Sequence, residues 1–272
     1  MKVIGVGNRK GGVGKTTHSV TLAAGLALQG FNVVLVDFSS QGNIGDVLAI
    51  PKHEHLYGMA VERKPILEVG QIVPADRYIP DQWSGKAGRM IAVTGFTKTS
   101  EIPGHLKYED VPIFSDRLLE LAETTETDVV IIDTPPETGP LDPFMYFAFD
   151  AVALVTHTEE SSYAGLVTAI QQIKRSGAYR QRFGLPATAI IGVIPNMVRR
   201  GVSLHERNYT ALQAQFKNAV LPIVPQGVIW QEASAQKQTI FRYAPHSNEA
   251  AIGYEISNII ANRLKLQIKS HD

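Results

Sequence analysis

Residues 10–17, which read Lys-Gly-Gly-Val-Gly-Lys-Thr-Thr, carry the clearest chemistry in this chain. The glycines allow backbone N–H groups to turn inward around a phosphate chain, because no Cβ atom blocks the approach. Lys15 supplies a point charge for the β- and γ-phosphates, and Thr16 supplies a hydroxyl ligand for Mg²⁺. Counted from Gly7, the ordinary phosphate-binding loop would need Lys and Thr at positions 13 and 14, where this chain has Val13 and Gly14. The variant that fits, Lys-Gly-Gly-x-Gly-Lys-Thr, begins with a second cation, Lys10. The expected nucleotide-binding residues of this loop are Lys10, Gly11, Gly12, Val13, Gly14, Lys15, Thr16 and Thr17.

Two apolar runs further along the chain each end in an aspartate, Asp37 and Asp133. Carboxylates at the carboxyl ends of parallel strands face the ligand crevice of an open α/β sheet. An aspartate in this position can also be a simple cap, but together with the loop the pair predicts a metal site. We expect Thr16, Asp37 and Asp133 to hold Mg²⁺, with Asp133 binding it directly or through water. The segment 134–139 would then sense the γ-phosphate.

The loop needs a strand before it and a helix after it, and the pattern of the whole chain supplies both. Apolar runs typical of buried parallel strands alternate with helical spacing. This alternation predicts an α/β fold with one doubly wound, mostly parallel sheet and helices on both faces. No linker is evident, so we expect one domain over residues 1–272. The expected strands are 3–6, 33–36, 90–93, 129–132, 151–155, 189–194 and 221–224, and the expected helices are 16–29, 115–125, 161–176, 204–217 and 247–265, with short helices and loops in 50–88.

Composition limits the function further. Lys plus Arg and Asp plus Glu number 26 each, so any contact with DNA requires a local cationic patch. The chain has no cysteine, which excludes disulfides, thiolate metal sites and cysteine-ligated iron–sulfur clusters. No apolar run is long enough to span a membrane. The sequence opens directly into a strand, so we expect a cytoplasmic protein.

These motifs resemble those of the ParA/MinD family of P-loop ATPases, and most closely the ParA partition proteins. The loop 10–17 is similar to the family's deviant Walker A motif, and Asp133-Thr134-Pro135-Pro136 to its Walker B motif. Residues 37–43 are similar to its Asp-x-Asp-Pro-Gln-Gly-Asn segment, and residues 232–234 and 250–254 to its C-terminal pattern. The resemblance implies an ATP- and Mg²⁺-dependent homodimer in which Lys10 reaches the partner's nucleotide. It also implies non-specific DNA binding, a ParB-like adaptor that stimulates hydrolysis, a nucleoid-associated location, and the positioning or segregation of a plasmid, chromosome or other cargo.

The chain departs from the family at one position that bears on hydrolysis. Ser39 stands where the family has its second aspartate, which is credited with orienting the attacking water. Serine can hydrogen-bond water but provides no carboxylate. Because phosphoryl transfer depends mainly on positioning and electrostatics, we expect slow turnover rather than none. A switch that binds nucleotide and barely hydrolyses it is the alternative. The residues expected to act in hydrolysis are Lys10, Lys15, Asp37 and Ser39.

The resemblance also assigns residues outside the loop. Asn196 occupies the position at which the family reads adenine, and Pro225 would pack beside the base. Cations near position 200 would contact DNA phosphates without reading sequence, although they could equally be a solvated face. Residues 224–230 lack the arginines that ParA proteins often carry there, which leaves the DNA surface open. The expected DNA-binding residues are Arg199, Arg200, Arg207 and Lys217.

Two other functions stay open at this stage. A MinD-like protein would attach to membranes through a basic amphipathic tail, and residues 259–269 combine apolar residues with three cations. The same tail fits a docked helix end, so we do not expect a membrane partner. A metabolic relative that uses ATP would need a second substrate site, for which the sequence offers no catalytic cluster.

Overall fold

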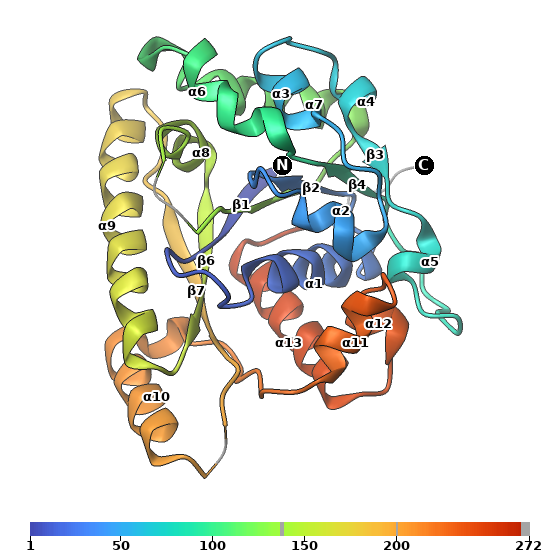
Figure 1. Ribbon diagram of the computed structural model, residues 1–272, viewed down its shortest axis with the longest axis vertical. Helices are drawn as coiled ribbons and strands as arrows, with labels where there is room; N and C mark the ends of the chain where they lie inside the picture. Colours follow the sequence, from blue (N-terminus) through green and yellow to red (C-terminus); the bar gives the residue numbers. More distant parts are fainter. Residues whose placement is uncertain (137–138, 200, 268–272) are drawn as a thin grey trace.

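The computed structural model describes residues 1–136, 139–199 and 201–267, and a seven-stranded sheet forms its centre (Figure 1). The strand order is β3-β4-β2-β5-β1-β6-β7. Every neighbouring pair is parallel except β3–β4. The expected doubly wound α/β fold is therefore confirmed. The strands are β1 (Lys2–Gly7), β2 (Val33–Asp37), β3 (Gln71–Ile72), β4 (Met90–Val93), β5 (Val129–Asp133), β6 (Ala151–His157) and β7 (Ala189–Asn196).

Helices cover both faces of the sheet, and alternate strand residues pack into two separate cores. Val33 and Leu35 face a core built with α1, α11, α12 and α13. Val34 and Val36 face the other core, built with α3, α7, α8, α9 and α10. Burial on both sides explains why the strands read as continuous apolar runs. The helices are α1 (Lys15–Leu28), α2 (Asn43–Leu48), α3 (His55–Ala60), α4 (Ile66–Val69), α5 (Ala75–Tyr78), α6 (Ile102–His105), α7 (Ile113–Thr125), α8 (Asp142–Ala148), α9 (Glu160–Arg182), α10 (Ser203–Phe216), α11 (Ile229–Ala235), α12 (Ile240–Tyr243) and α13 (Asn248–Arg263).

The expected strand over residues 221–224 is wrong. This segment runs beside β7, and the Leu221 and Val224 amides donate to the carbonyls of Val193 and Pro195. Only isolated bridges form there. Pro222 and Pro225 cannot donate to a ladder, which explains why no regular strand develops. The short edge strand β3 carries too little pattern to be recognised from sequence, and α9 runs six residues beyond its expected end at 176.

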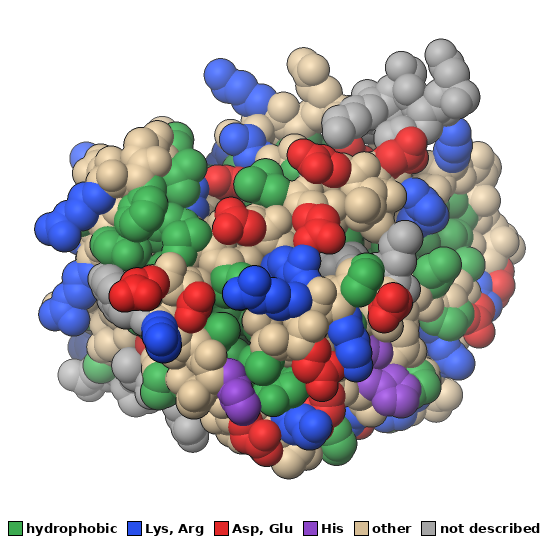
Figure 2. Space-filling view, turned by 90° about the horizontal axis from the view of Figure 1, so that it is seen from above, with side chains coloured by type: hydrophobic (Ala, Val, Ile, Leu, Met, Phe, Trp, Pro, Cys, Tyr) green, Lys and Arg blue, Asp and Glu red, His purple; other side chains and the backbone are tan. Residues whose placement is uncertain are grey.

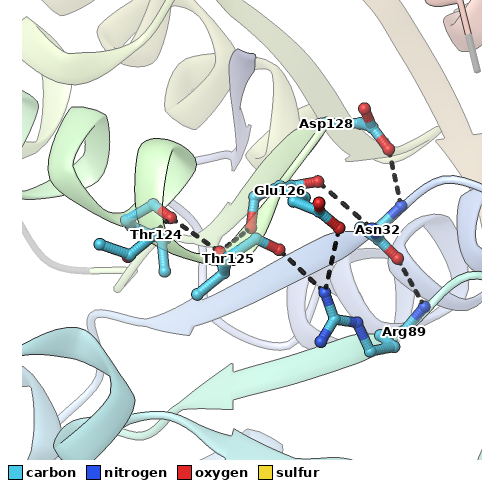
Figure 3. Close-up of polar contacts among 8 residues, drawn as sticks. Asn32, Arg89, Thr124, Thr125, Glu126 and Asp128 are labelled. Carbon is cyan, nitrogen blue, oxygen red and sulfur yellow. Dashed lines mark hydrogen bonds and ion pairs between the residues drawn. The ribbon is translucent and has the colours of Figure 1, made fainter. Parts of the chain in front are cut away.

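A polar network fixes the amino ends of three neighbouring strands (Figure 3). The backbone N–H of Asn32 donates to Asp128 Oδ2 at 2.9 Å, and Asn32 Oδ1 accepts from the Arg89 N–H at 3.0 Å. The Arg89 guanidinium also donates to the Thr125 carbonyl at 3.1 Å. Asn32 thus joins the turns that lead into β2, β4 and β5. With these ends in register, the opposite ends of the strands align to form the site.

Candidate nucleotide-binding site

The loop between β1 and α1 has the backbone conformation that a phosphate cradle requires. Gly12 and Gly14 adopt φ values of 72° and 93°, in the left-handed region that favours glycine. A Cβ atom on Gly14 would lie 2.4 Å from Asn196 Nδ2, so the position also lacks room for a side chain. Helix α1 begins directly after this loop, at Lys15. Its amino end therefore directs free N–H groups and a positive dipole toward the loop.

Asn8 holds the front of the loop, a role that the sequence analysis missed. Asn8 is only 1% exposed. Asn8 Oδ1 accepts the Lys10 N–H at 2.9 Å, and Asn8 Nδ2 donates to the Val155 carbonyl on β6 at 2.7 Å. An asparagine just after a strand is a local signal for a turn, but its partner on β6 lies 147 residues away. The loop is thereby anchored to the sheet by contacts within the protein.

The two lysines of the loop lie in different environments. Lys15 is buried, and its ammonium donates to the Lys10 carbonyl at 3.1 Å. Burial lowers the pKa of Lys15, while the nearby Asp133 carboxylate opposes this change. Lys10 Nζ lies 3.4 Å from Glu159 Oε2, with 29% of the Lys10 side chain exposed. Lys15 is therefore placed to contact phosphates within its own loop, whereas Lys10 lies at the protein surface.

Asp37 and Asp133 lie side by side at the carboxyl ends of β2 and β5. Asp133 accepts hydrogen bonds from Thr16 Oγ1 at 2.6 Å and from Ser19 Oγ at 2.9 Å. Burial raises the pKa of both carboxyls, and the charge of Asp133 raises that of Asp37 further. A hydroxyl and two buried carboxylates are hard oxygen donors of the type that Mg²⁺ prefers, and their excess negative charge favours a cation. This chemistry fits the expected magnesium site.

Ser39 and Asp37 also shape the turn that leads into α2. Asp37 accepts the backbone N–H groups of Ser39 at 2.8 Å and Ile44 at 3.1 Å. Ser39 Oγ accepts the Gln41 N–H at 3.1 Å, and Ser39 is 9% exposed. The structure therefore brings Ser39 to the edge of the carboxylate pair, as expected, with its hydroxyl engaged in the turn.

A cavity of about 620 Å³ continues from the loop toward α11. Thr17, Asn196 and Pro225 all line it, so the structure brings these predicted residues together. Asn196 Nδ2 donates to the Val13 carbonyl at 2.7 Å, and its side chain also hydrogen-bonds His18. Burial lowers the pKa of His18 to about 4, so this imidazole is neutral. Asn196 thus braces the loop as well as lining the cavity.

A family model described as an AAA domain matches residues 1–183. The chain belongs to the ParA/MinD family of P-loop ATPases. It is 28% identical over 268 residues to the sporulation initiation inhibitor protein Soj of Bacillus subtilis, covering 96% of this chain and 98% of that protein. It is also 26% identical over 255 residues to the chromosome partitioning protein ParA of Caulobacter vibrioides, covering 89% of this chain and 87% of that protein.

Solved structures of ParA/MinD-type proteins share the fold. An ATP complex of McdA from Cyanothece has a TM-score of 0.78 at 16% identity, covering 98% of this chain and 97% of that chain. Cobyrinic acid a,c-diamide synthase from Mycobacterium smegmatis, with an ATP analogue and magnesium, has a TM-score of 0.75 at 19% identity, covering 97% and 96%. The cell division ATPase MinD of Pyrococcus furiosus has a TM-score of 0.68 at 18% identity, covering 96% and 98%.

In this ParA/MinD-family chain, the described members of the expected DNA-binding set lie on or shortly after β7 and α10. Arg199 follows β7, and its guanidinium donates to Gln226 Oε1. Arg207 is exposed on α10, and Lys217 is exposed just after that helix. Arg200 lies outside the described residues, as do residues 137–138 of the expected γ-phosphate-sensing segment. DNA binding through Arg199, Arg207 and Lys217 on the surface around α10 therefore remains a prediction.

Proposed function

We propose that this chain is a single-domain ATPase that binds Mg·ATP at the phosphate loop and hydrolyses it slowly. The observation that carries the proposal is the pairing of Thr16 with Asp133 at 2.6 Å directly beneath the glycine loop. Lys15 would contact the β- and γ-phosphates, and the cavity toward α11 would take the base and ribose. Mg²⁺, when bound, would neutralise charge on the phosphates, and Thr16, Asp37 and Asp133 would hold it.

Slow turnover is supported by the geometry around Ser39. In this turn, the hydroxyl of Ser39 accepts from Gln41, and the Asp37 carboxylate accepts two backbone N–H groups. No carboxylate stands in the place of Ser39 to orient water. We therefore propose long-lived ATP complexes, and a nucleotide switch with almost no hydrolysis is the second candidate.

The role of Lys10 follows from its place at the protein surface and from the family. We propose that ATP drives homodimerisation and that Lys10 of each subunit contacts the nucleotide of the other. Two nucleotides brought face to face would repel each other, and a lysine ammonium reduces that repulsion. The similarity to Soj and ParA supports a partition ATPase that positions DNA or other cargo with an adaptor protein.

Non-specific DNA binding would use Arg199, Arg207 and Lys217. The face seen in Figure 2 mixes cations and carboxylates, so it offers no uniformly cationic surface. Helix α10, which carries Arg207, lies at the far end of the molecule from that face (Figure 1). None of the described helices is both long and apolar enough to cross a bilayer. We propose a nucleoid-associated protein on the similarity to the chromosome-partitioning proteins Soj and ParA, and liposome co-sedimentation with ATP tests the MinD-like alternative.

The experiment for the enzymatic proposal is a single-turnover assay with radiolabelled ATP, with and without Mg²⁺. We expect phosphate release that requires Mg²⁺ and disappears in Lys15→Ala. Phosphate release at an equal rate in Lys15→Ala would show that the activity comes from elsewhere. Mg·ATP binding without any release over hours would favour the switch.

A further inference from the structure

Arg9 is buried behind the phosphate loop in a network that the proposed chemistry does not use. Its side chain is 5% exposed and lies 2.7 Å from Asp142 Oδ2. Arg9 Nε donates to Gln172 Oε1 at 2.5 Å, and the guanidinium lies 5.1 Å from the centre of the Tyr146 ring. A buried guanidinium persists only with such partners, because removal of one partner leaves an uncompensated charge.

The partners of Arg9 lie on elements that are distant in sequence. Arg9 immediately precedes Lys10 in the loop, and Asp142 is the first residue of α8. The chain reaches α8 from Asp133 through the segment expected to sense the γ-phosphate. Gln172 on α9 donates to Asp142 Oδ2 at 3.1 Å, which adds a third element to the same cluster. One side chain therefore joins the front of the phosphate loop to α8 and α9.

This network reaches the protein surface. Burial raises the pKa of Asp142, whereas the Arg9 charge lowers it and favours an ionised pair. A hollow of about 220 Å³ lies beside the pair, between α8 and α9. Its lining includes Asp142, Tyr146 and Gln172, which all contact Arg9, together with the exposed Arg175. A change in the position of Arg9 would therefore alter the wall of an outer hollow.

We propose that Arg9 is a positioning residue that couples the nucleotide state of the phosphate loop to α8 and α9. The proposal rests on the proposed function, because it requires Mg·ATP binding. Because Arg9 is paired with Asp142, a shift of the Arg9 side chain when phosphates fill the preformed loop would pass directly to α8. Loss of Arg9 leaves the phosphate contacts of Lys15 and Thr16 in place but disconnects them from α8. Nucleotide would then still bind, but α8 and α9 would no longer respond to it.

The absence of cysteine permits a direct test. A single Arg175→Cys substitution in the full chain carries an environment-sensitive dye at the rim of the hollow. In this background we expect Mg·AMPPNP to change the dye emission. Arg9→Gln should abolish that change and lower kcat by about 5- to 150-fold, the usual range of coupling between sites. The AMPPNP Kd, measured by calorimetry, should change by less than about threefold, which is below that range.

Matched variants separate coupling from stability. Arg180→Gln removes a second buried arginine, which lies on α9, is 4% exposed, and pairs with Asp150 at 3.0 Å and with the Phe147 carbonyl of α8 rather than with Asp142. It should retain the dye response. Arg9→Gln combined with Asp142→Asn removes the unpaired buried charge, so it should recover thermal stability but not the response. Arg9→Lys should recover part of the response.

Three results would overturn the proposal. The first is a full dye response in Arg9→Gln. The second is an equal loss of response in Arg180→Gln, which would indicate that any disruption between α8 and α9 removes the response, whether or not the phosphate loop is involved. The third is a fall in AMPPNP affinity that accounts for the whole loss of kcat/KM. If the parent protein binds no AMPPNP, the proposed function fails instead, and calorimetry identifies that case.

Discussion

Lys10→Ala separates nucleotide binding from dimerisation in the proposed mechanism. In the described monomer, the Lys10–Glu159 ion pair spans 3.4 Å with side chains 29% and 50% exposed. Such an exposed pair contributes about 0–1 kcal/mol, so the unfolding free energy should hardly change. A charge-assisted hydrogen bond to a phosphate contributes about 1.5–3 kcal/mol. Two symmetric bonds give roughly 3–6 kcal/mol, which weakens the dimer about 10²- to 10⁴-fold.

Sedimentation equilibrium with saturating Mg·ATP measures this dimer constant, and calorimetry measures the nucleotide Kd. Lys64→Ala is the matched control, since Lys64 forms an exposed ion pair with Glu62 outside the loop. It should dimerise like the parent. An unchanged dimer constant in Lys10→Ala, with ATP bound, would refute the assignment. A comparable loss of ATP affinity would show that Lys10 acts within its own subunit.

Three further predictions concern the same site. Ser39→Asp should raise single-turnover hydrolysis by about a hundredfold, the lower end of what a positioned acid–base group contributes, and an unchanged rate would show that another group orients the water. Burial raises the pKa of Asp133 to about 6, so between about pH 4 and pH 6 the folded protein keeps a proton that the unfolded chain has released. The free energy of unfolding therefore falls as the pH rises through this window. Asp133→Asn should therefore raise the melting temperature of the nucleotide-free protein more at pH 8 than at pH 4, and an equal gain at both would contradict this cause. Gly14→Ala, at φ 93° and against Asn196, should cost roughly 1–3 kcal/mol in urea unfolding and abolish ATP binding; Gly184→Ala at φ 72° in open space is its control and should bind ATP normally.

The sequence predicted those parts of the site that depend on local pattern. The loop 10–17 and the aspartates at the ends of β2 and β5 follow from glycine spacing and from apolar runs. Six of the seven expected strands formed for the same reason. Residues 221–224 failed because two prolines interrupt the ladder beside β7, which apolarity alone does not reveal.

Contacts between distant segments could not be predicted from the sequence. Asn8 binds a carbonyl of β6, and Asn196 binds the Val13 carbonyl 183 residues away. Both depend on which strands become neighbours of β1, a property of the whole sheet. The pairing of Arg9 with Asp142 likewise requires α8 to pack behind the loop. The structure therefore reveals most about buried polar residues, such as Asn8 and Arg9, that lie next to the motif recognised in the sequence.

In the proposed function, the glycine loop and the carboxylates of Asp37 and Asp133 form one Mg·ATP site. Calorimetric titration of the full chain with ATP, with and without Mg²⁺, tests it most directly, with Lys15→Ala and Asp133→Asn in parallel. We predict one ATP per chain, tighter binding with Mg²⁺ for the parent, no binding for Lys15→Ala, and loss of the Mg²⁺ effect in Asp133→Asn. ATP binding that is equally tight in Lys15→Ala, or a Mg²⁺ effect that survives in Asp133→Asn, would show that ATP and Mg²⁺ bind elsewhere.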